Sequence, residues 1–267
     1  MKLYIKSFSS YRDDIDNLDI KKELKHTYKQ DTRRKDAFIH LAMLGILKLQ
    51  EKININPLDE LYMTSGVGNT DVLQRVDDYV YRLEQCIKPF DFINMLGNTT
   101  SYYVANTVGL KGKNIFQISD NFTFINSLIS IFASISSSKK EAILGSIDLI
   151  HEPKEIHQRI LGLQDEYNLI SSTNYQYLSL DSKDSLASLE FDVKIYTIDE
   201  INLILQNNLI NAIASPRCRN LQIEKENYFF ETMPSYLINQ YTQKNKDLLY
   251  IDCFEDEYKI LKLNILK

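Results

Sequence analysis

Short apolar segments with strand character alternate with longer helical segments through the first 150 residues, and this alternation limits the possible folds more than any other feature. Neighbouring parallel strands need a crossover of a dozen or more residues, which is usually a helix. The pattern therefore predicts an α/β protein with a mainly parallel sheet and helices on its faces. We expect strands at 2–7, 61–64, 114–119 and 142–147, and helices at 36–52, 70–87, 99–108 and 122–135.

The predicted helix 70–87 has apolar residues at steps of three and four, and we expect this face to be buried. Its apolar positions are Val72, Leu73, Val76, Val80, Leu83 and Ile87.

The pattern changes in the second half of the chain. Residues 171–185 are polar and rich in serine, which favours a loop or linker. Residues 189–195 then alternate strictly between apolar and charged, as in a strand with one exposed face near a sheet edge. A helix at 199–206, a strand at 209–213 and a hairpin of 248–254 with 258–266 complete the predicted fold.

Composition argues against several classes of function. The chain has 31 Lys and Arg against 36 Asp and Glu, a net charge of −5, and we interpret its basic residues as spread along its whole length, so we expect no nucleic-acid partner. Cys86, Cys218 and Cys253 are too few and too far apart for a disulfide framework or a zinc site. No apolar run approaches the ~18 residues of a membrane span, and the N-terminus lacks a signal-like apolar core, so we expect a cytoplasmic protein.

Four segments resemble β-ketoacyl-ACP synthases, and they occur in the family's order. GLKGKNIFQISDNFTF (109–124) resembles the family's G-L-x-G-P turn, the following strand and the elbow that enters a buried helix. INMLGNTTSYYVANTVG, SGVGNTD and AILGSID resemble an upstream segment, a glycine-rich turn and the next strand. The resemblance implies a thiolase-like fold with a largely complete N-terminal βαβαβαβ half (1–170) and a strongly shortened C-terminal half (171–267) that ends in the hairpin.

The departures from that family predict a protein without condensing activity. In the ungapped alignment the family's nucleophilic cysteine falls on Asn121, and a shift by one residue gives Phe122; neither side chain forms a thiolate. Ala214 and Ser215 stand where the family has its first histidine. His151 and His157, on an expected polar loop, do not replace it.

Similarity to the synthases without the cysteine implies a chain-length factor of the type found in aryl polyene and flexirubin-type pathways. Such a subunit forms a heterodimer with a full-length, active β-ketoacyl-ACP synthase, through the strand that here is 114–119, and acyl carrier protein reaches the complex. The resemblance implies polyketide, polyene or fatty-acid-like biosynthesis, with no cofactor and no metal. The positions it implies at the partner's acyl tunnel are Val67, Asp91, Phe92, Asn121 and Phe122.

Two other interpretations stay open. An acyltransferase or hydrolase would use Ser119 or Thr123 beside the elbow, although the sequence places no histidine to activate either hydroxyl. A purely structural partner would have no influence on the product. Among the remaining residues, we expect Cys86 and Cys253 to be small core residues and His40 to be a hydrogen-bonded core or boundary histidine. Arg33, Arg34 and Lys35 begin a solvated helix or contact an acidic carrier protein.

Overall fold

A nine-stranded mixed sheet forms the centre of the protein. The computed structural model describes residues 1–119, 121–150, 154–160, 162–163, 167–207 and 211–266. Across the sheet the strand order is β3-β2-β4-β6-β1-β7-β11-β10-β8, and two short strands, β5 (Asn168–Leu169) and β9 (Tyr228–Phe229), pair separately. The sheet consists of β1 (Lys2–Arg12), β2 (Glu60–Ser65), β3 (Asn114–Ile118), β4 (Ala142–Asp148), β6 (Ser172–Ser179), β7 (Ala187–Phe191), β8 (Ala212–Ala214), β10 (Leu248–Phe254) and β11 (Glu257–Ile265).

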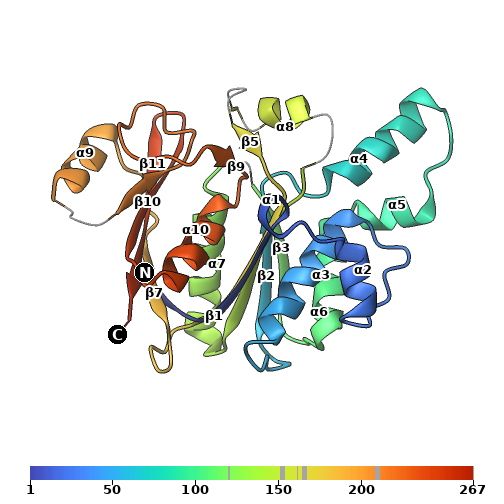
Figure 1. Ribbon diagram of the computed structural model, residues 1–267, viewed down its shortest axis with the longest axis horizontal. Helices are drawn as coiled ribbons and strands as arrows, with labels where there is room; N and C mark the ends of the chain where they lie inside the picture. Colours follow the sequence, from blue (N-terminus) through green and yellow to red (C-terminus); the bar gives the residue numbers. More distant parts are fainter. Residues whose placement is uncertain (120, 151–153, 161, 164–166, 208–210, 267) are drawn as a thin grey trace.

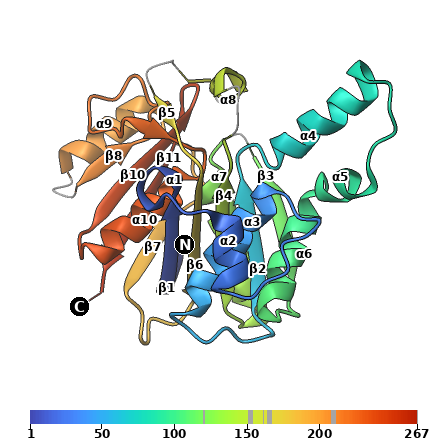
Figure 2. The same cartoon turned by 45° about the vertical axis from the view of Figure 1, so that its right-hand side comes forward.

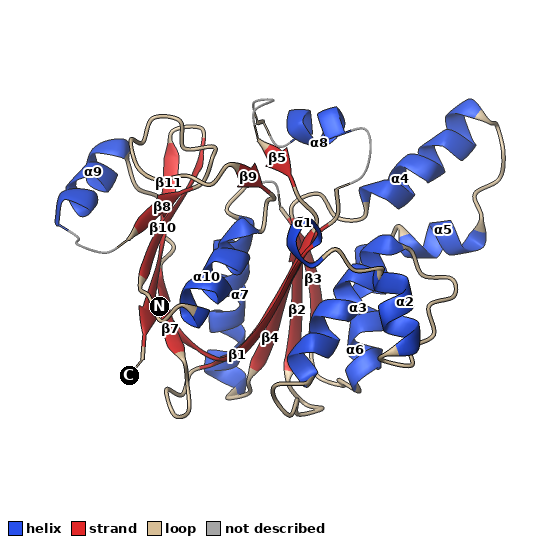
Figure 3. Ribbon diagram, viewed as in Figure 1, coloured by secondary structure: helices blue, strands red, loops and turns tan. Residues whose placement is uncertain are grey.

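The sheet curves around two helices. Figures 1 and 3 show α7 (Thr123–Ser138) and α10 (Met233–Gln243) between its two arms, and α3 (Ala37–Gln50) and α6 (Gly97–Val108) against the outside of the first arm. The largest core cluster accordingly joins α7 and α10 to strands of both arms. The remaining helices are α1 (Asp13–Asp16), α2 (Ile20–His26), α4 (Thr70–Asp77), its π-helical continuation η1 (Asp78–Arg82), α5 (Pro89–Asn94), α8 (Lys154–Ile160) and α9 (Ile198–Asn207).

The elements predicted for the first 150 residues are present within a few residues of their expected bounds. Helix α3 begins where the sequence placed it, because the Asp36 carboxylate accepts a hydrogen bond from the backbone N–H of Ile39 at 3.0 Å. The parallel prediction holds for β3-β2-β4 and for β8 with β10. It is wrong for the sheet as a whole, since the pairings from β4 through β6, β1, β7 and β11 to β10 are antiparallel.

The prediction of a loop at 171–185 is wrong for residues 172–179 and holds for 180–185. Residues 172–179 form β6, which is buried along its whole length between β4 and β1. Two of its polar side chains bond residues far along the chain: Gln176 Nε2 lies 2.7 Å from Asn239 Oδ1 of α10, and the Tyr175 hydroxyl donates to the Ala42 carbonyl at 2.9 Å. Because distant residues bond several of its polar groups, β6 can be buried although its composition resembles that of a loop.

Two further expectations are corrected. Strand β7 lies inside the sheet between β1 and β11, not at an edge, and it ends at Phe191, before the exposed Val193 and Ile195. The helix expected at 70–87 ends as η1 at Arg82, and of its apolar positions only Val72 is buried. Helices α4 and α5 instead project from the body of the molecule (Figure 2).

Helix α10 has no counterpart among the elements expected from the sequence. Its buried face combines Met233, Leu237 and Ile238 with the polar residues Ser235 and Asn239. The polar residues reduce the apolar periodicity by which a core helix is recognised.

Candidate functional site

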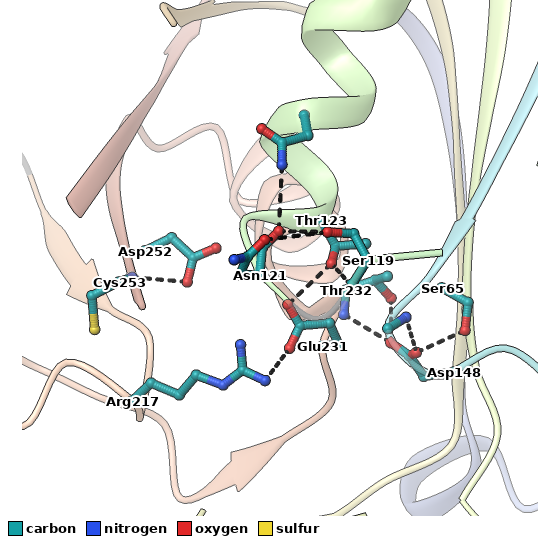
Figure 4. Close-up of polar contacts among 12 residues, drawn as sticks. Ser65, Ser119, Asn121, Thr123, Asp148, Arg217, Glu231, Thr232, Asp252 and Cys253 are labelled. Carbon is teal, nitrogen blue, oxygen red and sulfur yellow. Dashed lines mark hydrogen bonds and ion pairs between the residues drawn. The ribbon is translucent and has the colours of Figure 1, made fainter. Parts of the chain in front are cut away.

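A buried polar cluster surrounds the start of α7 and the residues that precede α10 (Figure 4). Thr123 opens α7, Glu231 and Thr232 lead into α10, and Arg217 and Asp252 approach from the second arm of the sheet. The resemblance placed the nucleophile at this end of α7.

An ion pair lies at the centre of this cluster. Arg217 Nη2 is 2.6 Å from Glu231 Oε2, and the two side chains are only 10% and 2% exposed. The other Glu231 oxygen, Oε1, is 3.1 Å from the Thr123 hydroxyl, which also hydrogen-bonds to the Ser119 carbonyl. Burial raises the pKa of Glu231 well above its ordinary value, and the charge of Arg217 opposes that rise.

Asp148 joins the end of β4 to two other segments through four hydrogen bonds. Its Oδ2 accepts from the backbone N–H and the hydroxyl of Thr232, each at 2.8 Å. Its Oδ1 accepts from the Gly66 N–H at 3.0 Å and the Ser65 hydroxyl at 3.2 Å. Burial raises the pKa of Asp148, and the hydrogen bonds act in the opposite direction by favouring the carboxylate.

Glu231 also explains why residue 66 is a glycine. A Cβ at position 66 would lie 2.2 Å from the Glu231 Cβ. The turn after β2 can therefore approach the start of α10 this closely only without a side chain.

Asp252 and Lys259 are buried ionisable groups on neighbouring strands. Burial raises the pKa of Asp252 to about 6, and the charges of Arg217 and Lys259 oppose the rise. Lys259 Nζ donates to Asn126 Oδ1 in the first turn of α7 at 3.0 Å and lies 5.5 Å from the centre of the Phe122 ring. Burial lowers the pKa of Lys259.

The entry to α7 has an elbow-like backbone but no thiol. Phe122 is left-handed, with φ +47°, and its side chain is buried. The Asn121 carbonyl accepts a hydrogen bond from the Ser119 hydroxyl at 2.8 Å. Cys218 and Cys253 are buried in a separate apolar cluster, and burial raises the pKa of Cys218. Cys86 is exposed, so its prediction as a core residue is wrong.

His40 lies away from this site. His40 is buried, and its Nε2 is 3.0 Å from the Thr32 carbonyl, which confirms it as a core histidine. His157 is buried in α8 rather than on a polar loop, and His151 lies outside the described residues. In the part of the chain that the structure describes, no three His, Cys, Asp or Glu side chains are arranged to hold a metal ion.

The positions named for the acyl tunnel are spread over several elements. Val67 packs against the small cluster of Leu169 and Phe229. Asp91 on α5 forms an ion pair with Arg75 of α4 at 3.3 Å, and Phe92 is 50% exposed. Asn121 and Phe122 lie at the start of α7 instead.

Sequence reasoning missed the four charged residues that dominate the cluster: Asp148, Arg217, Glu231 and Asp252. Two of them left a signal, because Asp148 ends the apolar strand AILGSID and Asp252 interrupts LLYIDCF. An aspartate inside an apolar strand is rarely buried without partners. Each of these two aspartates therefore indicated a buried polar contact, but the sequence did not identify the residue that it contacts.

Comparison with solved structures identifies the fold. No model of a protein family matches the sequence, and no curated protein is similar to it. The ishigamide ketosynthase/chain length factor superposes with a TM-score of 0.76 at 9% identity, over 100% of this chain and 100% of that chain. The chain has the ketosynthase/chain-length-factor fold.

Other structures with this fold agree. The PfaC keto synthase–chain length factor superposes with a TM-score of 0.68 at 8% identity, over 100% of this chain and 43% of that chain. The ketosynthase ApeO in complex with its chain length factor ApeC, from Xenorhabdus doucetiae, has a TM-score of 0.59 at 8% identity, over 98% and 99% of the two chains. The thiolase-like α/β fold predicted from the sequence is thus confirmed. Among the described residues, no helix combines the length and the apolar character that crossing a membrane requires.

Proposed function

We propose that this protein is a non-catalytic ketosynthase-like subunit that pairs with an active β-ketoacyl synthase. The observation that carries the proposal is the entry to α7, where Asn121 and Phe122 take the place of a reactive thiol. The acidic and basic groups beside it are buried and bonded to one another, as in the Arg217–Glu231 pair. Neither Asn121 nor Phe122 can form the thiolate that accepts an acyl group.

The surface around β3 supports a partner subunit. β3 is an edge strand, paired only with β2 among the strands the structure describes. An unpaired edge offers free backbone groups to another chain. Large apolar side chains are exposed on β3 and on the segment 73–96 that contains α4, η1 and α5: Leu73, Val80, Leu83, Phe90, Phe92, Ile93, Leu96 and Ile118. Unburied apolar residues gathered in this way are typical of a protein interface.

We expect the protein to co-purify with a full-length ketosynthase encoded beside it and to elute as a heterodimer in size-exclusion chromatography. Ile118→Asp, in the edge strand, should weaken the complex by at least about tenfold, because a charge would then be buried at the centre of the interface. Val193→Asp is the matched control, since Val193 is 67% exposed and far from β3 in the sheet order. A monomer that ignores the ketosynthase would contradict the proposal.

The acyl-tunnel residues remain part of this proposal. A subunit that sets product length would present Val67, Asp91 or Phe92 to the partner's acyl channel, with Asn121 and Phe122 at the elbow. The exposed ring of Phe92 is available for such a contact, whereas the Asp91 carboxylate is held by Arg75. The pathway, whether polyketide, aryl polyene or fatty-acid-like, is proposed from the resemblance alone. A cytoplasmic location is proposed from the sequence, which has no signal-like apolar core at its start and no apolar run of membrane length.

Acyl carrier protein is proposed to reach the complex, and α2 with the following loop offers a basic surface for it. Residues 21–35 contain seven Lys or Arg and two Asp or Glu, a net charge of +5 in a chain of net charge −5. Our interpretation that the basic residues are evenly spread is therefore wrong for this segment. Lys21, Lys25, Lys29 and Arg34 are exposed. Such a surface favours an acidic protein partner.

The purified subunit alone should form no covalent adduct with acyl-ACP, as measured by intact mass. The Thr123 hydroxyl is fully buried and bonded to the Ser119 carbonyl, and Ser119 donates to the Asn121 carbonyl. Neither hydroxyl has a histidine partner among its recorded hydrogen bonds to described residues. An active ketosynthase incubated in parallel is the positive control, and an adduct mapped to Ser119 or Thr123 would favour the acyltransferase or hydrolase interpretation.

A further inference from the structure

A row of polar side chains crosses four adjacent strands on the side of the sheet that faces α7 and α10. Thr64 of β2 is in register with Ser146 of β4, Ser146 with Asn174 of β6, and Asn174 with Ser10 of β1. All four belong to the same face, because Tyr62, Leu144 and Leu178, two or four residues away on their strands, pack into the core cluster of α7 and α10.

Three members of this row are buried without a protein partner for a polar atom. Thr64, Ser146 and Asn174 have no exposed surface. Thr64 Oγ1, Ser146 Oγ and Asn174 Oδ1 form no hydrogen bond with any residue that the structure describes. A buried polar atom that stays unpaired is unfavourable, so three in consecutive register positions call for a physical explanation.

The spacing of the row suits a bridging molecule with the size of water. Cβ atoms of directly opposite residues on adjacent strands lie about 4.5–5.5 Å apart, and in this row the three polar atoms form no direct hydrogen bond with one another. One water oxygen, about 2.8 Å from each of two polar atoms, spans that gap. A water can also accept from a hydroxyl and donate to the Asn174 carbonyl oxygen, as this mixed set of groups requires.

We infer that Thr64, Ser146 and Asn174 form an internal binding site for ordered water between the sheet and the pair α7 and α10. The protein itself completes the row at its far end, where Asn239 Nδ2 of α10 donates to Ser10 Oγ at 2.9 Å. The bound water does at Thr64, Ser146 and Asn174 what Asn239 does at Ser10. The water thereby connects strands β2, β4 and β6 near the first turns of α7 and α10. These turns position Thr123 and Glu231.

Thr173 offers a matched control within the same sheet. Its Oγ1 is also buried and has no hydrogen bond to the described residues, and its side chain also has no exposed surface. It faces the opposite side, toward Gly45 of α3, and its register neighbours are Ile147 and Tyr11. A water there would lack the two or more polar partners that hold buried water in place.

The test compares Thr64→Val with Thr173→Val in urea unfolding, together with a high-resolution crystal structure of the unmodified protein. Thr64→Val should increase the unfolding equilibrium constant by about tenfold, because it removes one partner of the water and leaves Ser146 and Asn174 under-bonded. Thr173→Val should leave that constant unchanged or decrease it. Thr64→Val combined with Ser146→Ala should cost less than the two single changes together, since the water is lost only once.

Electron density for a water within hydrogen-bond distance of Thr64 and Ser146 would support the site directly. Density that shows these two hydroxyls paired with protein atoms would overturn it. Equal effects of Thr64→Val and Thr173→Val would also overturn it. If Thr64→Val does not fold, the crystal structure of the unmodified protein still decides.

Discussion

Replacing Arg217 with methionine should destabilise the protein by about 3 to 5 kcal/mol near pH 8, because Glu231 would lose its cation inside the protein. The size of the effect follows from burial, since the Glu231 side chain is only 2% exposed. Water cannot replace the guanidinium at that depth. The free energy of unfolding, measured by urea titration, checks the prediction.

The destabilisation caused by Arg217→Met should depend on pH in a defined direction. Burial already raises the folded-state pKa of Glu231 above its unfolded value, so its contribution to stability is present below the unfolded pKa and is lost as pH rises through the folded pKa. Without Arg217 the folded pKa is higher still, because the charge that opposed the rise is gone. Arg217→Met should therefore be much less destabilising near pH 5 than near pH 8.

Two further variants make the interpretation specific. Adding Glu231→Gln to Arg217→Met should recover part of the stability at pH 8, because a neutral amide replaces the unpaired charge. Arg219→Met is the control, since Arg219 is exposed and its guanidinium donates to the Gly162 carbonyl at 3.1 Å, and it should cost less than about 1 kcal/mol. A pH-independent loss would mean that Arg217 acts through packing rather than charge.

Gly145→Ala should destabilise the protein by about 3 kcal/mol or more, or prevent soluble expression. A Cβ at position 145 on β4 would lie 2.4 Å from Cε1 of the Tyr175 ring. The ring cannot move away, because a Cβ at Gly45 of α3 would lie equally close to its Cε2, so the tyrosine is held between two glycines. Overpacking a fully buried site of this kind forces backbone or rotamer strain.

The steric clash caused by Gly145→Ala can be separated from the general effect of replacing a glycine. Gly162→Ala introduces a Cβ with no atom of the described residues within 4 Å, at a φ of +65°, so only the backbone strain of about 1 to 2 kcal/mol should appear. Combining Gly145→Ala with Tyr175→Leu should cost less than the sum of the single changes, because the smaller side chain frees the space. Additive losses would show that the tyrosine ring is not the obstacle.

Much of the first half of the fold could be read from the chain. Helix α3 and strands β2, β3 and β4 follow local apolar patterns, and the capping carboxylate of Asp36 marks a helix start within four residues of its partner. The absence of a cysteine at the elbow was equally visible, because residue identity at a position is already known from the sequence. These features depend on neighbours a few residues apart.

The central strand β6 and the central helix α10 could not be predicted in this way. Their polar residues are tolerated in the core only because Gln176 meets Ser235 and Asn239, about 60 residues further along the chain. The apolar face of α4 was visible, but whether it packs inside the molecule or remains available to a partner is decided by where the helix lies.

By itself, then, the sequence determined the α/β alternation, the first four strands and the loss of the thiol. The tertiary structure alone decided the mixed direction of the sheet and the closed cluster of Arg217, Glu231 and Asp148. The physical reason is that apolar periodicity indicates which face of a helix or strand is buried. Burial of a charged side chain instead requires a partner residue, which can be distant in the sequence. Asp148 finds Thr232 at a separation of 84 residues, and no local pattern records that contact.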